Sequence, residues 1–247
     1  MHTKIGQTFP TETNGNSSKP LLPIVAGGLN ITCEDNMLLM ARYPDDYFDL
    51  AIVDPPYNVG ASNGSFGRGG KKSKIKENRK DLKHYSNHNK TPEIEYFNEL
   101  FRVSKNQIIW GANYYPEFLK HSGWLVWDKD KKDGILSMAE LAYQSIDNRV
   151  MIFKHEWEGF RKGTGSFEDG HNRVIHPNEK PVKLYKYCLK NYAKEGDKIL
   201  DTHLGSGSIA IACHDYNFEL TACELDPEYF EKAKQRIINH VAQQSLF

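Results

Sequence analysis

The sequence predicts an α/β fold, a single doubly wound and mostly parallel β-sheet, on the strength of three observations. Short apolar runs of three to five residues recur along the chain, as in strands that are buried on both faces. Segments with helical spacing alternate with these runs near both ends of the chain, which is the order that builds a parallel sheet. The length of 247 residues suits one substantial core with elaborated loops.

Seven apolar runs are predicted to be strands of this sheet, although periodicity alone does not separate them from buried helix. In chain order they are residues 30–33, 49–53, 107–110, 124–127, 150–153, 198–200 and 220–223.

Three of the intervening helices have recognisable ends. The first is predicted to start at Pro92, with Thr91 as its N-cap. The second spans about residues 182–194 and stops before a glycine. The third begins after Asp226 and Pro227, with apolar residues at helical spacing along one face.

The remaining organisation is simple. Residues 1–27 are expected to form a flexible N-terminal arm, because polar residues, glycine and proline dominate there. Residues 28–247 are expected to form the single domain. Basic and acidic residues number 32 each, so any nucleic-acid site must be a local patch.

Cysteine usage and hydropathy exclude several classes of protein. The four cysteines are far apart and form no CxxC pair or His/Cys cluster, which predicts reduced thiols and no metal site. Neither a signal peptide nor an apolar run long enough to span a bilayer is visible, so we expect a cytoplasmic protein with no membrane association.

Ligands of such sheets bind at the carboxyl ends of the strands, and the first unusual strand end is Asp54-Pro55-Pro56-Tyr57. The two prolines stiffen the backbone and leave carbonyls free to accept hydrogen bonds, and Asp54 adds a carboxylate acceptor. An amino group on a purine or pyrimidine ring is a poor nucleophile, since its lone pair is delocalised into the ring. Acceptors at Asp54 and the Pro55 carbonyl would free that lone pair, while Tyr57 would stack on the flipped base.

Two further strand ends indicate a nucleoside-containing cofactor. Gly205 and Gly207 allow close backbone approach to a ligand before a helix N-terminus. Glu224 closes the next strand and is placed to bind ribose hydroxyls, whereas Asp226 is better explained as a helix cap. The spacing of Gly205, Gly207 and Ala210 also fits a dinucleotide fingerprint, so a nicotinamide-dependent oxidoreductase is an alternative.

Chain order separates these two classes of enzyme. After Gly205 only about one strand and one helix remain, too little to complete a dinucleotide fold in its usual order. The Asp-Pro-Pro-Tyr element has no use in a dehydrogenase.

Four segments, in this order, resemble the DNA amino-methyltransferase family of the beta arrangement, in which the catalytic motif precedes the cofactor motif. They are residues 54–57, residues 176–181 (His-Pro-Asn-Glu-Lys-Pro), residues 201–208 and Glu224. The resemblance covers roughly residues 30–240 and implies the Rossmann-like sheet of S-adenosylmethionine-dependent methyltransferases.

The resemblance also implies roles for individual residues. Asp54, Pro55, Pro56 and Tyr57 would hold the target amino group. Asp35 would contact the adenine of S-adenosylmethionine, although an Asp before a helix is commonly only its cap. The full set implied to bind the cofactor is Asp35, Lys180, Pro181, Asp201, His203, Gly205, Ser206, Gly207, Ser208 and Glu224.

One departure from the family concerns the cofactor motif. The family usually has Pro and Phe where this chain has Thr202 and His203. The departure implies either that the imidazole of His203 replaces an aromatic contact near the sulfonium or that His203 is a hydrogen-bonded turn residue.

Duplex DNA is the expected partner, on the evidence of two basic segments. Residues 58–90, next to the catalytic motif, form a glycine-rich and strongly positive loop, and an insertion at about residues 155–175 forms a second candidate surface. The candidate phosphate-binding residues are Arg68, Lys71, Lys72, Lys74, Lys76, Arg79, Lys80, Arg161 and Lys162. A homodimer is one assembly that the sequence leaves open.

The predicted reaction is direct methyl transfer to the amino nitrogen of adenine, with no metal and no covalent enzyme intermediate, as in a restriction-modification methyltransferase. Aspartate at position 54 resembles adenine enzymes, whereas cytosine enzymes often have serine there, so amino-cytosine methylation is the nearest alternative. RNA or protein-glutamine acceptors and a catalytically inactive nucleic-acid-binding module remain further alternatives.

Overall fold

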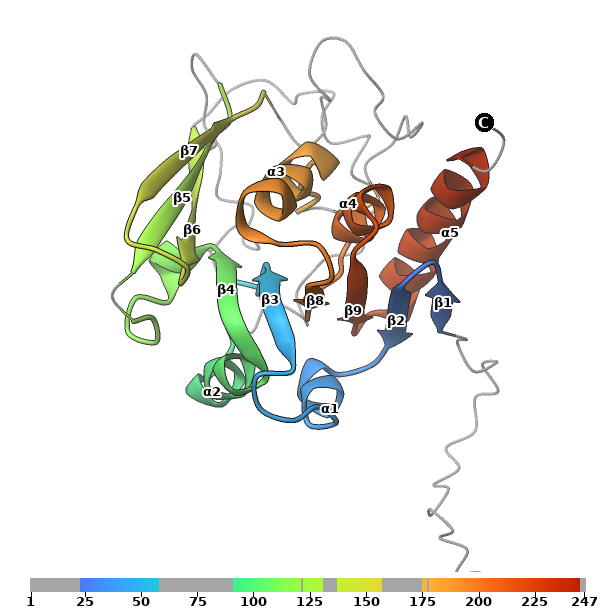
Figure 1. Cartoon of the computed structure of the whole chain (residues 1–247), viewed down its shortest axis with the longest axis horizontal. Helices are drawn as coiled ribbons and strands as arrows, with labels where there is room; N and C mark the ends of the chain where they lie inside the picture. The colour runs from blue at the N-terminus through green and yellow to red at the C-terminus, as the bar shows by residue number, and fades with distance from the viewer. Residues whose placement is uncertain are drawn as a thin grey trace, which may run out of the picture.

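The computed structural model describes residues 23–57, 91–120, 122–130, 137–156, 175–176 and 178–244. Within these residues nine strands form one sheet in the order β1-β2-β9-β8-β3-β4-β6-β5-β7 (Figure 1). The strands are β1 (Ile24–Ala26), β2 (Leu29–Cys33), β3 (Phe48–Val53), β4 (Ser104–Trp110), β5 (Gly123–Asp128), β6 (Ala139–Gln144), β7 (Val150–Lys154), β8 (Lys198–Asp201) and β9 (Glu219–Glu224).

Helices cover both faces of the sheet. Figure 1 shows α1 and α2 on one side and α3, α4 and α5 on the other. The helices are α1 (Asn36–Met40), α2 (Ile94–Val103), α3 (Val182–Tyr192), α4 (Ser208–Tyr216) and α5 (Pro227–Gln244), and a short 3-10 helix, η4 (Ala112–Tyr114), follows β4.

The pairing confirms a mostly parallel sheet. Strands β2, β9, β8, β3 and β4 are parallel neighbours, and β7 is parallel to β5. Two strands run against their neighbours, namely β1 against β2 and β6 against both β4 and β5. The fold is therefore the doubly wound α/β fold that the sequence predicts.

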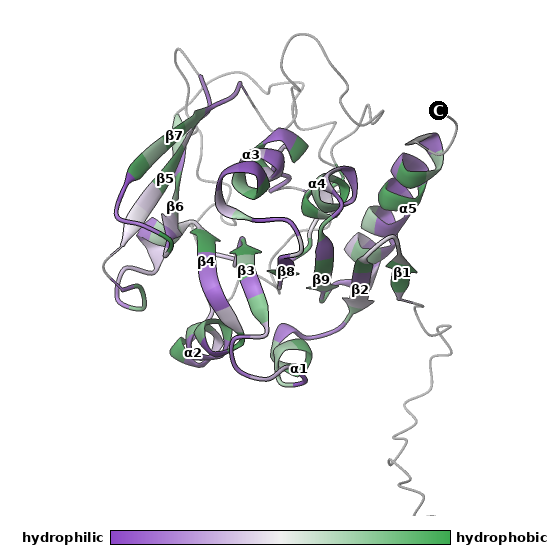
Figure 2. Ribbon diagram, in the orientation of Figure 1, coloured by the Kyte–Doolittle hydropathy of each residue, from purple (hydrophilic) through white to green (hydrophobic). Residues whose placement is uncertain are grey.

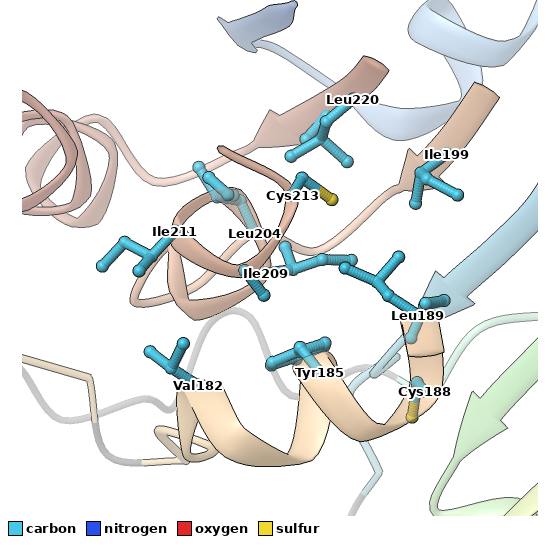
Figure 3. Packing of buried hydrophobic residues seen from close by; sticks show 14 of the residues in the cluster. Val182, Tyr185, Cys188, Leu189, Ile199, Leu204, Ile209, Ile211, Cys213 and Leu220 are labelled. Atoms are coloured by element: carbon cyan, nitrogen blue, oxygen red, sulfur yellow. The ribbon is translucent and has the colours of Figure 1, made fainter. Parts of the chain in front are cut away.

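Residue alternation along the central strands builds two hydrophobic cores, one on each face. Ile52 and Ile108 pack with α3, α4 and α5, whereas Val53 and Ile109, one residue later on the same strands, pack with α1 and α2. Figure 2 shows hydrophobic and hydrophilic residues side by side on the helices, as expected of helices with one buried face. On the first face, Figure 3 shows side chains of α3 pointing towards Ile209 of α4.

All seven predicted strands are present, and the structure adds β1 and β6. Residues 24–26 belong to the predicted arm but pair with β2, so that part of the prediction is wrong. Only three residues form this strand, too few to show a pattern. Strand β6 was missed because Glu140 and Gln144 interrupt its apolar character.

The helix ends agree only in part. Asp226 caps α5 as predicted, since its Oδ1 accepts the amide hydrogens of Glu228 and Tyr229. The predicted cap at Thr91 is wrong, because α2 begins at Ile94 and Thr91 lies on the wall of the cavity described below. In the part of the chain that the structure describes, no helix combines the length and apolarity that crossing a bilayer demands.

Candidate active site

A cavity of about 530 Å³ lies at the carboxyl ends of β2, β3, β8 and β9. Its wall includes Asp35 after β2, residues 54–57 after β3, residues 202–206 after β8 and Glu224 at the end of β9. His176 and Lys180 contribute from the segment before α3. The volume falls in the range of cofactor and small-molecule sites, and the place in the fold is the one where open α/β sheets bind ligands.

The Asp-Pro-Pro-Tyr turn follows β3 directly and lines the cavity with all four residues. The Oη atom of Tyr115 lies 2.8 Å from the Pro55 carbonyl oxygen and 2.7 Å from the Pro56 carbonyl oxygen. The ring of Tyr57 stacks on that of Tyr114, with 4.3 Å between ring centroids and 8° between planes. The turn is therefore held both at its carbonyls and at its aromatic ring.

Asp54 forms a buried ion pair with Lys180 through its Oδ2 atom. The side chains are 15% and 4% exposed, respectively. The Oδ1 atom of Asp54 is also buried and has no hydrogen-bond partner among the described residues. Since a buried carboxylate oxygen without a donor is unfavourable, this atom is poised to accept a hydrogen bond from a ligand.

Lys180 is shared between two carboxylates. Its Nζ lies 3.3 Å from Oε2 of Glu140 on β6, and Glu140 in turn pairs with Lys129. Desolvation opposes a charge on Lys180, but Asp54 and Glu140 outweigh it and raise its pKa well above the ordinary value. Lys180 is therefore an ammonium ion between two acidic groups.

The two carboxyl groups respond differently to this lysine. Burial raises the pKa of Asp54 above its ordinary value, and the attraction of Lys180 opposes that rise. Burial also acts to raise the pKa of Glu140, but Lys180 and Lys129 together hold it below its ordinary value. Asp54 is thus the more basic of the two carboxylates, which suits a group that receives protons.

The glycine-rich loop after β8 is tied to the end of β9. One oxygen of Glu224 accepts the amide hydrogen of Gly205 and the other accepts that of Asp226, both at 2.9 Å. Gly205 and Gly207 have φ angles of 55° and 77°, a backbone region that favours glycine. Both oxygens of Glu224 retain lone pairs for a further donor, such as a hydroxyl group.

His203 lies on the cavity wall in a defined hydrogen-bonding chain. The side-chain amide of Asn36 donates to Nε2 at 3.1 Å, so Nδ1 carries the hydrogen that is donated to Thr202 Oγ1 at 2.9 Å. Burial lowers the pKa of His203 to about 3. The imidazole is therefore neutral at physiological pH and does not repel a positively charged ligand.

Arg236 of α5 connects two segments that line the cavity. Its Nη1 donates to the Ser206 carbonyl oxygen and to Ser208 Oγ, both at 3.0 Å, and lies 3.7 Å from Glu179, the residue before Lys180. This buried arginine links the glycine-rich loop to the lysine segment.

The structure brings ten of the fourteen predicted catalytic and cofactor residues together on the cavity wall, including all four of the catalytic turn. Among the predicted cofactor residues, the wall contains Asp35, Lys180, His203, Gly205, Ser206 and Glu224. Asp35 also caps α1, since its Oδ1 accepts the amide hydrogens of Met37 and Leu38.

Four predicted cofactor residues lie behind the wall: Pro181, Asp201, Gly207 and Ser208. Asp201 accepts the amide hydrogen of His203 at 2.9 Å and shapes the loop from below, and burial raises its pKa to about 8. Gly207 is the N-cap residue of α4, and a Cβ there would lie 3.1 Å from Ile237. The geometry gives these residues supporting positions.

The predicted phosphate-binding residues cannot be placed. Arg68, Lys71, Lys72, Lys74, Lys76, Arg79, Lys80, Arg161 and Lys162 all lie outside the described residues. Across the described ranges, the His, Cys, Asp and Glu side chains form no cluster that could hold a metal ion.

Three residues of the site were missed in the sequence, namely Tyr115, Glu140 and Arg236. Each reaches the site from an element distant in sequence, and for Glu140 and Arg236 no local pattern marks the contact. For Tyr115, the one available signal was Gly111 followed by paired tyrosines at a strand end.

Comparison with known proteins gives consistent matches. The family described as DNA methylase matches residues 70–235 of the chain. The type II methyltransferase M.HpaI of Haemophilus parainfluenzae is 23% identical over 238 residues, which cover 84% of this chain and 73% of that protein. The type II methyltransferase M.Cfr9I of Citrobacter freundii is 26% identical over 142 residues, 48% of this chain and 46% of its own length.

Two solved structures share the fold. The PvuII DNA methyltransferase, described as cytosine-N4-specific, has a TM-score of 0.56 at 11% identity and covers 84% of this chain and 86% of its own. The M1.HpyAVI–SAM complex has a TM-score of 0.51 at 16% identity and covers 84% of this chain and 99% of its own.

Proposed function

The chain belongs to the DNA methylase family, and from that premise we propose that it transfers a methyl group from S-adenosylmethionine to the exocyclic amino nitrogen of adenine in duplex DNA. The observation that carries the proposal is the unpartnered Oδ1 atom of Asp54, a buried carboxylate oxygen on the cavity wall. Membership of this family argues against the nicotinamide-dependent alternative.

The residues of the cavity fit S-adenosylmethionine. Glu224 offers carboxylate lone pairs to ribose hydroxyls, and Asp35 lies on the same wall for the adenine. The neutral imidazole of His203 tolerates the sulfonium charge. When bound, the cofactor supplies an electrophilic methyl group.

The acceptors of the catalytic turn activate the amino group. Asp54 Oδ1 and the Pro55 carbonyl oxygen would each accept a hydrogen bond from one N–H group, which concentrates the lone pair on the nitrogen. The nitrogen held by these acceptors would be the nucleophile for the methyl group that the cofactor supplies, and the sulfur would leave as a neutral thioether. The nitrogen loses its extra proton to Asp54, whose pKa burial raises.

The choice of adenine rests on Asp54, because the sequence resembles adenine enzymes at this position. Amino-cytosine remains the competing substrate. The test is incubation with methyl-labelled S-adenosylmethionine and duplex DNA, RNA or no acceptor, followed by digestion to nucleosides. We expect labelled N6-methyladenine from DNA alone; N4-methylcytosine would correct the base, and no label in DNA would reject the function.

Glu224→Gln is expected to weaken S-adenosylmethionine binding by about 10–100-fold, since hydrogen bonds to charged groups contribute about 1.5–3 kcal/mol. Isothermal titration calorimetry measures the dissociation constant. Glu219→Gln, at the exposed opposite end of β9, is the matched control and should bind as the wild type does. Equal affinity in the two variants would remove Glu224 from the cofactor site.

A further inference from the structure

Two consecutive tyrosines after β4 contact the catalytic turn from different directions. The ring of Tyr114 stacks on Tyr57, and the hydroxyl of Tyr115 lies within 2.8 Å of both prolyl carbonyl oxygens. The cavity wall does not include Tyr115, so its contact is with the turn and not with the ligand space.

Local geometry fixes the place of these tyrosines. Gly111 ends β4 with a φ angle of 70°, and its amide donates to the Leu141 carbonyl oxygen of β6 at 2.9 Å. A Cβ at Gly111 would lie 2.6 Å from ring atoms of Tyr57, so only glycine lets the strand turn against that ring. The turn then leads into η4 and delivers Tyr115 to the core.

Tyr115 is buried against other aromatic rings and remains a hydrogen-bond donor. Its side chain is fully buried at 0% exposure, and its ring packs 5.2 Å from that of Phe97, measured between centroids. Burial raises the pKa of its hydroxyl far above the ordinary value, so the hydroxyl keeps its proton at neutral pH.

The hydroxyl has one proton for two carbonyl oxygens. When the hydroxyl donates its hydrogen bond to the Pro56 carbonyl oxygen, the Pro55 carbonyl oxygen keeps both lone pairs for an incoming amino group. The backbone of the turn cannot provide this support itself, because neither proline has an N–H group.

We propose that Tyr115 is a positioning residue for methyl transfer. Its hydroxyl donates a hydrogen bond to the Pro56 carbonyl oxygen and so orients the turn with the Pro55 carbonyl oxygen directed at the target amino group. The inference rests on the proposed function and extends it from the turn to its support. The orientation of the Pro55 carbonyl oxygen affects the transition state of methyl transfer more than it affects cofactor binding. We therefore expect the Tyr115 hydroxyl to act on kcat.

The test is Tyr115→Phe, which deletes one oxygen atom and keeps the buried ring. We expect kcat for DNA methylation to fall about 10–100-fold, as a misaimed acceptor does. The dissociation constant for S-adenosylmethionine should stay within about twofold of wild type. The matched control is Tyr143→Phe, which deletes a buried hydroxyl from the same core cluster at a site on β6. Its kcat should be unchanged.

Two outcomes would overturn the proposal: an unchanged kcat in Tyr115→Phe, or an equal loss in Tyr143→Phe, which would indicate a general effect of core hydroxyls. Hydrogen–deuterium exchange at the Tyr57 amide supplies a reading that needs no substrate. It should accelerate in Tyr115→Phe alone. If the wild-type protein methylates no DNA, the proposed function fails. Separately, an unaltered exchange rate of the Tyr57 amide in Tyr115→Phe would show that Tyr115 does not support the catalytic turn.

Discussion

Asp54→Ala is expected to reduce kcat for methyl transfer by about 10³-fold or more while S-adenosylmethionine still binds. The variant loses the Oδ1 acceptor and the group that receives the proton, but the wall around Glu224 is untouched. Lys180 keeps Glu140 as a partner, so the substitution does not strand the buried ammonium. Single-turnover methylation and calorimetric binding of the cofactor measure the two effects separately.

Asp49→Ala is the matched control for this experiment. Asp49 lies near the other end of β3, where it pairs with Lys105 and accepts the Lys198 amide hydrogen. Methyl transfer should survive its removal. Unchanged turnover in Asp54→Ala would withdraw Asp54 from its assigned role, and a matching loss of cofactor affinity would assign it to binding.

Lys180→Met is expected to lower the free energy of unfolding by about 3–5 kcal/mol at neutral pH, the usual effect of removing one partner from a buried ion pair. Asp54 and Glu140 would then share one buried region without the cation between them. Denaturant unfolding measures the change. Lys105→Met, which breaks an exposed ion pair with Asp49, should leave the free energy of unfolding nearly unchanged.

The pH dependence gives this experiment a sharper form. In wild type, Lys180 and Lys129 overcome burial and hold the pKa of Glu140 below the unfolded value, so Glu140 contributes stability above that value and loses it as pH falls. In Lys180→Met, burial without Lys180 raises the folded pKa of Asp54 further, so the unfolded chain ionises first and stability declines as pH rises. The loss in free energy of unfolding that Lys180→Met causes should therefore be larger at about pH 8 than at about pH 5. Equal deficits at both pH values would contradict the shared-lysine interpretation.

The sequence predicted the parts of the site that follow strand ends. Asp54 and Glu224 were recognisable because a buried apolar run placed each at the ligand-binding edge before any contact was known. Glu140 and Tyr115 were not recognisable, since their roles depend on the pairing of β6 with β4. No local sequence pattern indicates that an antiparallel strand is inserted at this place in the sheet. Thr91 shows the converse: a good local cap signal gave way to a position on the cavity wall.

The strand order also bears on how the protein is made. Strand β3 lies between β4 and β8, and β2 pairs with β9, so early and late parts of the chain interleave in one sheet. A nascent chain that has emerged from the ribosome only as far as β7 has unpaired edges on β2 and β3 and lacks Lys180, the ion-pair partner of Asp54. Such non-local pairing closes slowly. The cavity at the carboxyl ends of β2, β3, β8 and β9 can therefore form only after β9 has been synthesised.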